Sequence, residues 1–357
     1  MQPAFLSALS YCFSLKLRMH IGIILCSLWL ALAASTQAEP LAADLVKDKQ
    51  PIDLHQEKYR QLFTELSQKH GFTSQELQDI FQGVVIDRQV LVLMDKQWEA
   101  KPYYEYAPLF LTEENIRNGK EQLQRHKPLL DKIEAQFGVD RETVVAIWGV
   151  ETKFGVAQGK FDVLQTLNTL FDAYPRRSAF FRSQLIHFLL LCKENKIDPH
   201  GIKGSYAAAF GQTQFIPSSF REYAVSFDGD AKRDVWNSVP DILASIANYL
   251  KRFHWTLDAP VYIQLGNTLQ DQQLVAAEAK GRTAKIGIDL VRRAQQVSLP
   301  PSPGNRPVTI VGLELPPGQA FAKRFVAGYP NFQAITAWNN SNRYAMVVSE
   351  LAEALAR

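Results

Sequence analysis

The residue with the clearest chemical potential is Glu151, because it is a single carboxylate that follows a long apolar run. Residues 144–150 form this run, and Phe154 follows closely. Burial disfavours the charged form of a carboxylate and raises its pKa. A glutamate tuned in this way holds a proton near neutral pH and can act as a general acid. The run alone leaves open that Glu151 is an ordinary surface glutamate near a helix end, paired with Lys153.

The helix that would carry Glu151 belongs to a mostly helical region between residues 56 and 250. Asp140 is a favourable N-cap for this helix, and Thr73 and Thr112 are favourable starts for two others. Apolar residues at helical spacing predict further elements. The expected helices include 57–70, 180–192 and 240–253.

The character of the sequence changes after Trp255. Residues 260–265 and 307–311 are short β-prone runs, and a Pro-rich loop lies between them at 299–304. The tail 344–356 has a helical pattern again. The predicted fold class is therefore α+β and mainly α, with a helical body and a small β-containing subdomain.

The first residues have the pattern of a secretory signal peptide. Lys16 and Arg18 precede the apolar stretch 21–34, and small residues follow up to Ala38. A protein secreted across a membrane is therefore expected, with an uncleaved N-terminal anchor as the alternative. Lipid attachment is not expected, because the bulky pair Ile-Leu precedes Cys26 where a small pair would be needed.

Net charge and cysteine content place two limits on what the protein can be. The chain carries a formal charge of +3, and the signal contains two of its basic residues and no acidic ones, which leaves +1. Such a small charge gives no indication of nucleic-acid binding. After the signal, Cys192 is the last cysteine left, so stability must come from a core and not from an intramolecular disulfide.

Five stretches of the sequence form a recognisable set. They are 149–155 around Glu151, 174–177, 204–219, the acidic stretch 228–236 with 245–250, and 329–346. Together, and in the same order from about Tyr106 to the C-terminus, they resemble the membrane-bound lytic murein transglycosylase B family, enzymes of bacterial cell-wall turnover.

The resemblance implies a lysozyme-like catalytic core in which Glu151 is the catalytic residue. In the family scheme, this glutamate protonates the oxygen of the β-1,4 bond between N-acetylmuramic acid and N-acetylglucosamine. It then takes the proton of the muramic 6-hydroxyl, which closes a 1,6-anhydro ring, so no water is consumed. No second carboxylate stands beside Glu151 in its motif, which fits a one-carboxylate scheme rather than the usual pair.

Further residues fall on family positions that line the glycan groove. A hydroxyl or amide there would hydrogen-bond sugar groups, and an aromatic ring would offer a flat face to a sugar ring. Turn chemistry and packing remain the alternative interpretations, the latter most strongly for Tyr249. Trp338 stands where the family usually has Tyr, so sugar affinity is expected to differ. The expected substrate-binding residues are Ser205, Gln214, Tyr106, Tyr249, Asn339 and Tyr344.

The acidic stretch after residue 225 is a degenerate version of a calcium loop found in some family members. An EF-hand loop needs carboxylates at its first, third and fifth positions and Gly at its sixth. Here the first position is Ser226 and the sixth is Ala231, which leaves Asp228, Asp230 and Asp234. We therefore expect no tight metal site, and we expect no cofactor.

The sequence, with this resemblance, thus predicts a periplasmic lytic transglycosylase that acts on peptidoglycan. Its expected partners are glycan strands, with wall synthesis or turnover proteins as further candidates and no nucleic acid. We expect a monomer. A hydrolase acting on the same polymer and a non-catalytic wall-binding protein remain alternatives. The expected parts are the signal peptide 1–38, an N-terminal helical region 39–110, the catalytic core 111–255, a small β-containing subdomain 256–325, and a C-terminal segment 326–357 that returns to the core groove.

Overall fold

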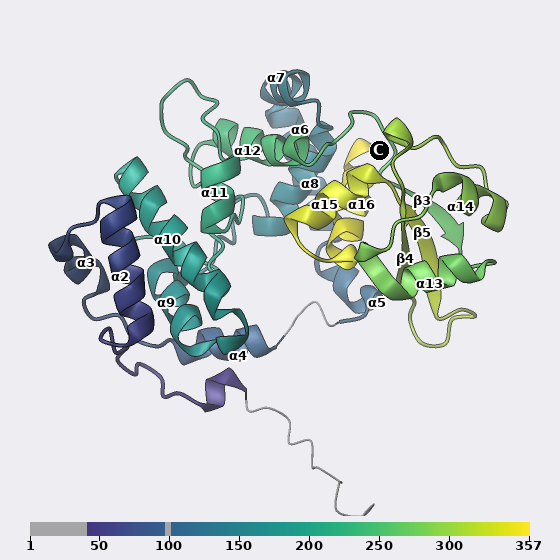
Figure 1. Cartoon of the computed structure of the whole chain (residues 1–357). Helices are drawn as coiled ribbons and strands as arrows, with labels where there is room; N and C mark the ends of the chain where they lie inside the picture. Colours follow the sequence, from purple (N-terminus) through teal and green to yellow (C-terminus); the bar gives the residue numbers. More distant parts are fainter. Residues whose placement is uncertain (1–40, 97–100) are drawn as a thin grey trace, which may run out of the picture. The chain divides into compact units, whose positions relative to one another are not determined.

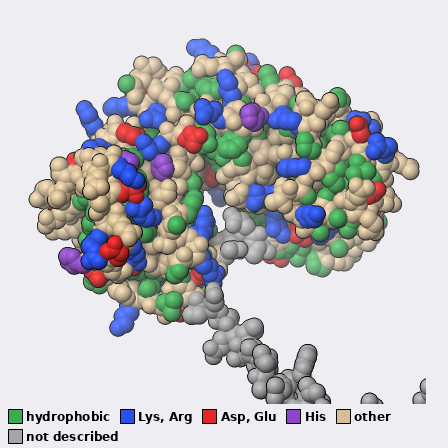
Figure 2. Space-filling model, in the orientation of Figure 1, with side chains coloured by type: hydrophobic (Ala, Val, Ile, Leu, Met, Phe, Trp, Pro, Cys, Tyr) green, Lys and Arg blue, Asp and Glu red, His purple; other side chains and the backbone are tan. Residues whose placement is uncertain are grey.

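The computed structural model of the chain describes residues 41–96 and 101–357 (Figure 1). The predicted signal peptide and its cleavage site lie outside these residues. Within the described ranges, no helix is both long and apolar enough to span a membrane. On the face in Figure 2, acidic and basic side chains are interspersed, in agreement with the small net charge.

The first helices form a layer that packs on the middle of the chain. The predicted helix at 57–70 is confirmed as α2, and Thr73 caps the next helix through a reciprocal capping box with Glu76. An aromatic cluster joins this layer to the following part, because the ring of Tyr59 contacts Phe81 and Phe171. The helices of this layer are α2 (Glu57–His70), α3 (Ser74–Phe81) and α4 (Arg88–Asp95).

The central helices surround α8, which carries Glu151. Every residue of α8 from Thr143 to Val150 is buried, so burial covers the whole circumference, as expected of a core helix. Its neighbours are α6, α7, α12 and the C-terminal α16. The central helices are α5 (Tyr103–Tyr106), α6 (Glu113–Arg125), α7 (Lys127–Phe137), α8 (Arg141–Thr152), α9 (Val163–Ala173), α10 (Ser178–Asn195), α11 (Pro217–Tyr223) and α12 (Val239–Arg252).

Asp140 occupies the N-cap position of α8 as predicted, but its side chain does not cap the helix. Its carboxylate instead accepts hydrogen bonds from Trp255 Nε1 at 2.7 Å and from the Asp258 amide at 3.2 Å. A tertiary partner therefore replaces the local one, and the start of α8 is tied to the chain beyond α12.

Two small antiparallel sheets complete the fold. β1 (Phe161–Asp162) pairs with β2 (Lys203–Gly204), and the larger sheet has the order β3 (Tyr262–Gly266), β5 (Lys323–Gly328), β4 (Thr309–Glu314). Alternation along β4 sends Val311 and Leu313 to the main core and Ile310 to a second core. The second core is closed by α13 (Gln272–Lys280) and α14 (Ile288–Gln295).

The predicted strands near 260–265 and 307–311 are confirmed as β3 and β4, whereas the central strand β5 was not predicted. The predicted C-terminal helix is confirmed as α16 (Asn342–Ala356), and α15 (Pro330–Trp338) precedes it. In Figure 1, α15 and α16 lie between α8 and the larger sheet. Short 3-10 turns connect these elements at Ala42–Asp44 (η1), Ala107–Leu109 (η3), Pro175–Arg177 (η4), Gly281–Thr283 (η5) and Pro303–Asn305 (η6).

Candidate active site

Glu151 lies in the last turn of α8 and is half-buried. The helix ends directly after it, because Lys153, Phe154 and Gly155 all have left-handed backbone conformations. At Gly155 the fold requires glycine, since an added Cβ would lie 2.4 Å from Gln212 Oε1. The sharp exit of the chain leaves the carboxyl of Glu151 at the end of the helix rather than on its side.

The carboxyl of Glu151 is held at one oxygen and left open at the other. Trp338 Nε1 donates to Oε1 at 2.8 Å, and the Tyr344 hydroxyl donates to the same oxygen at 2.5 Å. Oε2 receives no hydrogen bond from another described residue. A surface ion pair with Lys153 is therefore not what the structure shows.

Burial raises the pKa of Glu151 to about 7, and the hydrogen bonds from Tyr344 and Trp338 lower it in part. The rise expected from the apolar run is confirmed. No acidic side chain in the described ranges is among the causes of the shift. Burial, followed by the nearby Glu151, also raises the pKa of Tyr344, so this hydroxyl keeps its proton and remains a donor.

The two donors reach Glu151 from neighbouring C-terminal helices. Ser341 caps α16 by accepting a hydrogen bond from the Tyr344 amide at 3.2 Å. Trp338 ends α15, and its ring lies 4.7 Å from that of Tyr249. The Tyr249 hydroxyl donates to the Ala337 carbonyl at 2.6 Å. Tyr249 therefore fixes the end of α15 and, with it, the indole that contacts Glu151.

Ser205 and Gln214 lie in the irregular loop between β2 and α11. The Ser205 hydroxyl accepts from the amides of Ala207 at 3.3 Å and Ala209 at 3.1 Å. The Gln214 amide donates to the carbonyls of Gly211 at 2.9 Å and Gln158 at 3.2 Å. Both side chains thus order the loop, and neither hydrogen-bonds Glu151. Their contact with sugar stays a prediction.

Gln212 is a site residue that sequence reasoning missed. Its Oε1 accepts from Trp148 Nε1 at 2.8 Å, and its Nε2 donates to the Trp236 carbonyl at 2.7 Å. The Thr152 hydroxyl donates to its backbone carbonyl at 3.3 Å. Gln212 therefore connects the loop to α8 on both sides of Glu151. A glutamine two residues before Gln214 in the same motif was the available signal.

Tyr106 and Asn339 differ in how deeply their side chains are buried. Tyr106 is 7% exposed, and the centre of its ring lies 5.1 Å from that of Phe110. It is close enough to Tyr344 to contribute to the raised pKa of the Tyr344 hydroxyl. Asn339 is half-buried at the end of α15. Its backbone amide donates to the Ile335 carbonyl at 3.4 Å, whereas its side-chain amide forms no hydrogen bond with another described residue. Asn339 is therefore the freer of the two to bind a ligand.

The degenerate calcium loop uses its carboxylates to hold its own backbone. Asp228 accepts from Ser238 Oγ at 2.7 Å and from the Asp230 amide at 3.2 Å. Asp230 accepts from the Lys232 amide at 2.6 Å, and Asp234 from the Trp236 amide at 2.9 Å. In the part of the chain that the structure describes, no group of three His, Cys, Asp or Glu residues is arranged to hold a metal ion. The weakness of any calcium site stays a prediction.

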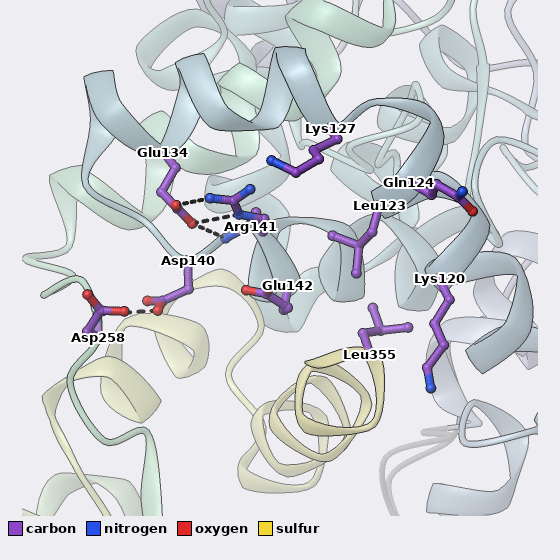
Figure 3. A pocket seen from close by; sticks show the side chains of 10 residues that line it. All are labelled: Lys120, Leu123, Gln124, Lys127, Glu134, Asp140, Arg141, Glu142, Asp258 and Leu355. Carbon is purple, nitrogen blue, oxygen red and sulfur yellow. Dashed lines mark hydrogen bonds and ion pairs between the residues drawn. The ribbon is translucent and has the colours of Figure 1, made fainter. Parts of the chain in front are cut away.

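A cavity of about 540 Å³ lies at the start of α8, at the opposite end from Glu151 (Figure 3). The rise of about 1.5 Å per residue places it about 15 Å from the catalytic candidate. At its edge, Arg141 forms ion pairs with Asp131 and Glu134, and Asp140 is held as described above. These contacts anchor the start of α8, and the cavity is separate from the site around Glu151.

Comparison with known proteins agrees with this geometry. Residues 55–353 match the transglycosylase SLT domain. The chain is 33% identical over 307 residues to membrane-bound lytic murein transglycosylase B of Escherichia coli K12, covering 83% of this chain and 82% of that protein.

Solved structures of similar proteins extend the agreement to the fold. The Escherichia coli lytic transglycosylase Slt35 in complex with calcium matches with a TM-score of 0.75 and 32% identity, over 86% of this chain and 96% of that chain. SltB3 from Pseudomonas aeruginosa in complex with NAG-anhNAM-pentapeptide matches with a TM-score of 0.69 and 33% identity, over 84% and 79%. The lysozyme-like fold class and the family expected from the sequence are confirmed. The chain belongs to the SLT-domain family of lytic transglycosylases, enzymes that cleave peptidoglycan.

Proposed function

We propose that the enzyme cleaves the β-1,4 bond between N-acetylmuramic acid and N-acetylglucosamine with Glu151 as its sole acid and base, and forms 1,6-anhydromuramic ends. The observation that carries this proposal is the raised pKa of the Glu151 carboxyl without a contribution from a second carboxylate. Its pKa is about 7, and no acidic side chain contributes to the shift. Glycosidases with two carboxylates place the second within roughly 5–9.5 Å, a distance at which a neighbouring charge would be felt in a partly buried site.

In the first step Glu151 acts as the acid. Its Oε1 accepts from both Trp338 and Tyr344, so the proton belongs on Oε2, the oxygen without a donor among the described residues. Oε2 gives this proton to the glycosidic oxygen while the bond from that oxygen to C1 of the muramic sugar breaks. The bonding pair leaves with the protonated oxygen, and positive charge develops at C1 and the ring oxygen.

In the second step the same carboxylate acts as the base. It removes the proton from the 6-hydroxyl of the muramic sugar as that oxygen bonds to C1 and closes the anhydro ring. Glu151 is protonated again at the end, so the cycle consumes no water and needs no second carboxylate. A pKa near 7 suits both steps, because an acid–base group works best when its pKa lies near the working pH.

The ligands of a similar protein support this product. SltB3 from Pseudomonas aeruginosa has been solved with NAG-anhNAM-pentapeptide and with NAG-NAM-pentapeptide. The first ligand contains the anhydro sugar that the one-carboxylate scheme forms. We infer that this chain accepts the same class of glycan.

For substrate binding we propose direct roles for Asn339 and Ser205. The side-chain amide of Asn339 makes no hydrogen bond to another described residue. The Ser205 hydroxyl accepts from two backbone amides but keeps its own proton to donate. Gln214 has two donor contacts to the backbone and retains its carbonyl oxygen for a sugar hydroxyl. The burial of Tyr106 and Tyr249 favours the packing role for both rings.

We further propose that the enzyme acts in the periplasm on peptidoglycan strands, as a monomer. The support is the signal-like pattern up to Ala38 and a substrate that lies in that compartment. Wall synthesis or turnover proteins remain candidate partners, and no cofactor is needed for the scheme above.

Mass spectrometry of the products released from purified peptidoglycan sacculi tests the proposal. The wild type is compared with Glu151→Gln and with Glu142→Gln, a control on the same helix about 14 Å away. We expect anhydromuramic ends from the wild type and the control and none from Glu151→Gln. Reducing ends from the wild type would instead identify a hydrolase. Binding of sacculi without any products would identify a wall-binding protein.

A further inference from the structure

Phe154, three residues after Glu151, has a backbone conformation that its residue type disfavours. Its φ is +59°, and it directly follows Lys153, whose φ is +50°. One left-handed residue after a helix is common. Lys153 fills that role, since its amide donates to the Gly149 carbonyl at 3.0 Å. A second left-handed residue that is large and aromatic is strained, and such strain persists only where the surrounding structure holds it.

The ring of Phe154 lies in a slot that two glycines leave open between α6 and α8. A Cβ at Gly149 of α8 would lie 2.7 Å from Phe154 Cζ, and a Cβ at Gly119 of α6 would lie 3.3 Å from the same atom. Leu355 of α16 packs beside Gly119, at 2.6 Å from the position of that Cβ. Both glycines are buried within helices, where glycine is less favourable than alanine. The close fit of the ring gives a physical reason for this glycine slot.

The last turn of α8 is held on both sides of Glu151 in the chain. Before it, the ring of Trp148 meets the Phe154 ring edge-on, with 5.5 Å between the ring centres. After it, the Thr152 hydroxyl accepts from the Gly155 amide at 3.0 Å. The backbone of Glu151 is therefore fixed by contacts that do not involve its own side chain.

The direction of the Glu151 carboxyl matters because both of its donors come from other helices. Trp338 ends α15 and Tyr344 belongs to α16, and each reaches Oε1 from its own helix. A rotation at the end of α8 would separate Oε1 from both donors at once. Misplacement of a catalytic group by about 1 Å can lower a rate about 100-fold.

We propose that Phe154 is a positioning residue for Glu151, because its ring in the glycine slot fixes the left-handed end of α8 and so the direction of the carboxyl. This inference rests on the proposed function, in which that carboxyl is the acid and the base. A ring that only packs would contribute to stability alone. A positioning ring also determines kcat and the pH dependence of catalysis.

The test measures kcat, KM and the pH profile of kcat/KM on soluble peptidoglycan fragments. Phe154→Leu removes part of the ring from the slot. Phe81→Leu is the matched control, because it removes the same atoms from a buried ring of the N-terminal layer that packs on Tyr59. We expect kcat of Phe154→Leu to fall about 30-fold, with KM changed less than about 2-fold. The control should keep the wild-type values.

The pH profile gives a readout that lost packing would not change. The hydrogen bonds from Tyr344 and Trp338 lower the pKa of Glu151. When Phe154→Leu loosens the end of α8, both bonds weaken and this pKa rises. The alkaline limb of the profile should therefore move up by about half a pH unit or more, while that of Phe81→Leu stays in place.

Gly149→Ala tests the same slot while Phe154 is present. Its new Cβ would lie 2.7 Å from Phe154 Cζ, so it should lower kcat and move the alkaline limb in the same way. Leucine has no Cζ, so the double variant Gly149→Ala/Phe154→Leu should recover kcat by about 5-fold over either single variant. Because Gly149→Ala keeps the native ring, it decides the question even if Phe154→Leu does not fold.

The possible failures are distinguishable. Wild-type kcat and an unmoved limb in Phe154→Leu or in Gly149→Ala, beside an inactive Glu151→Gln, would assign the ring to packing and overturn the inference. Losses that multiply in the double variant would overturn it as well, because the two side chains would then act independently. An active Glu151→Gln would instead refute the proposed function.

Discussion

Replacement of Trp338 by Phe tests the control of the Glu151 proton most directly. The change removes the 2.8 Å hydrogen bond to Oε1, while an aromatic ring remains to pack against Tyr249 and Phe215. A hydrogen bond to a charged group contributes about 1.5–3 kcal/mol, and one pKa unit corresponds to about 1.4 kcal/mol. Because Trp338 lowers the pKa of Glu151, its loss should raise that pKa by about one unit, from about 7 to about 8.

The assay is the pH profile of kcat/KM. The first step needs protonated Glu151, so activity falls as pH rises through its pKa. In Trp338→Phe, this alkaline limb should move up by about one unit. Trp338→Tyr should lie between Phe and the wild type, because its hydroxyl can donate to the same oxygen. A limb that stays in place in Trp338→Phe, or moves to lower pH, would refute the assignment of Trp338 as a positioning residue for Glu151.

Three further predictions concern Glu151, the neighbouring Gly155 and the separate Asp228 loop. The pKa of Glu151 is higher in the folded than in the unfolded protein, so its contribution to stability is complete below about pH 4.5 and is lost as pH rises through about 7. Between pH 5 and pH 8, the stability of Glu151→Gln relative to the wild type should therefore increase, by at most about 3 kcal/mol. Thermal melts measure this difference, and a difference that does not change with pH would contradict the prediction. Gly155→Ala should lower the free energy of unfolding by about 3 kcal/mol, because the new Cβ would sit on a left-handed backbone and lie 2.4 Å from Gln212 Oε1. A loss of less than about 1 kcal/mol in a denaturant titration would contradict the local geometry. Millimolar calcium should leave the melting temperature unchanged within about 1 °C, because the Asp228 loop lacks a first carboxylate and the turn glycine; a sharp rise would overturn this expectation.

Local signals in the sequence predicted the elements whose stability is local. Thr73 and Thr112 each accept a hydrogen bond from a backbone amide of the helix that they precede, as their residue types indicate. The apolar run before Glu151 predicted a core helix and a raised pKa, because burial on all sides follows from a helix that is apolar on all sides. These features depend on neighbours within a turn or two.

Other elements depended on distant partners. The predicted cap Asp140 binds Trp255, 115 residues away. The central strand β5 begins with Lys323 and Arg324, which made it a poor strand candidate. In the structure both charges are neutralised by ion pairs, with Glu278 and Glu350. Sequence periodicity detects neither a distant hydrogen-bond partner nor a distant ion pair, since it depends only on residues that are close in the chain.

The sequence by itself indicated Glu151 as the candidate acid, and the tertiary structure determined how its carboxyl is held. A lone glutamate after an apolar run is a property of a short segment. Its two donors, Trp338 and Tyr344, lie 187 and 193 residues further along the chain. They reach Glu151 only because α15 and α16 pack beside α8. That packing selects Oε1 as the anchored oxygen, which leaves Oε2 as the oxygen that we propose to be reactive.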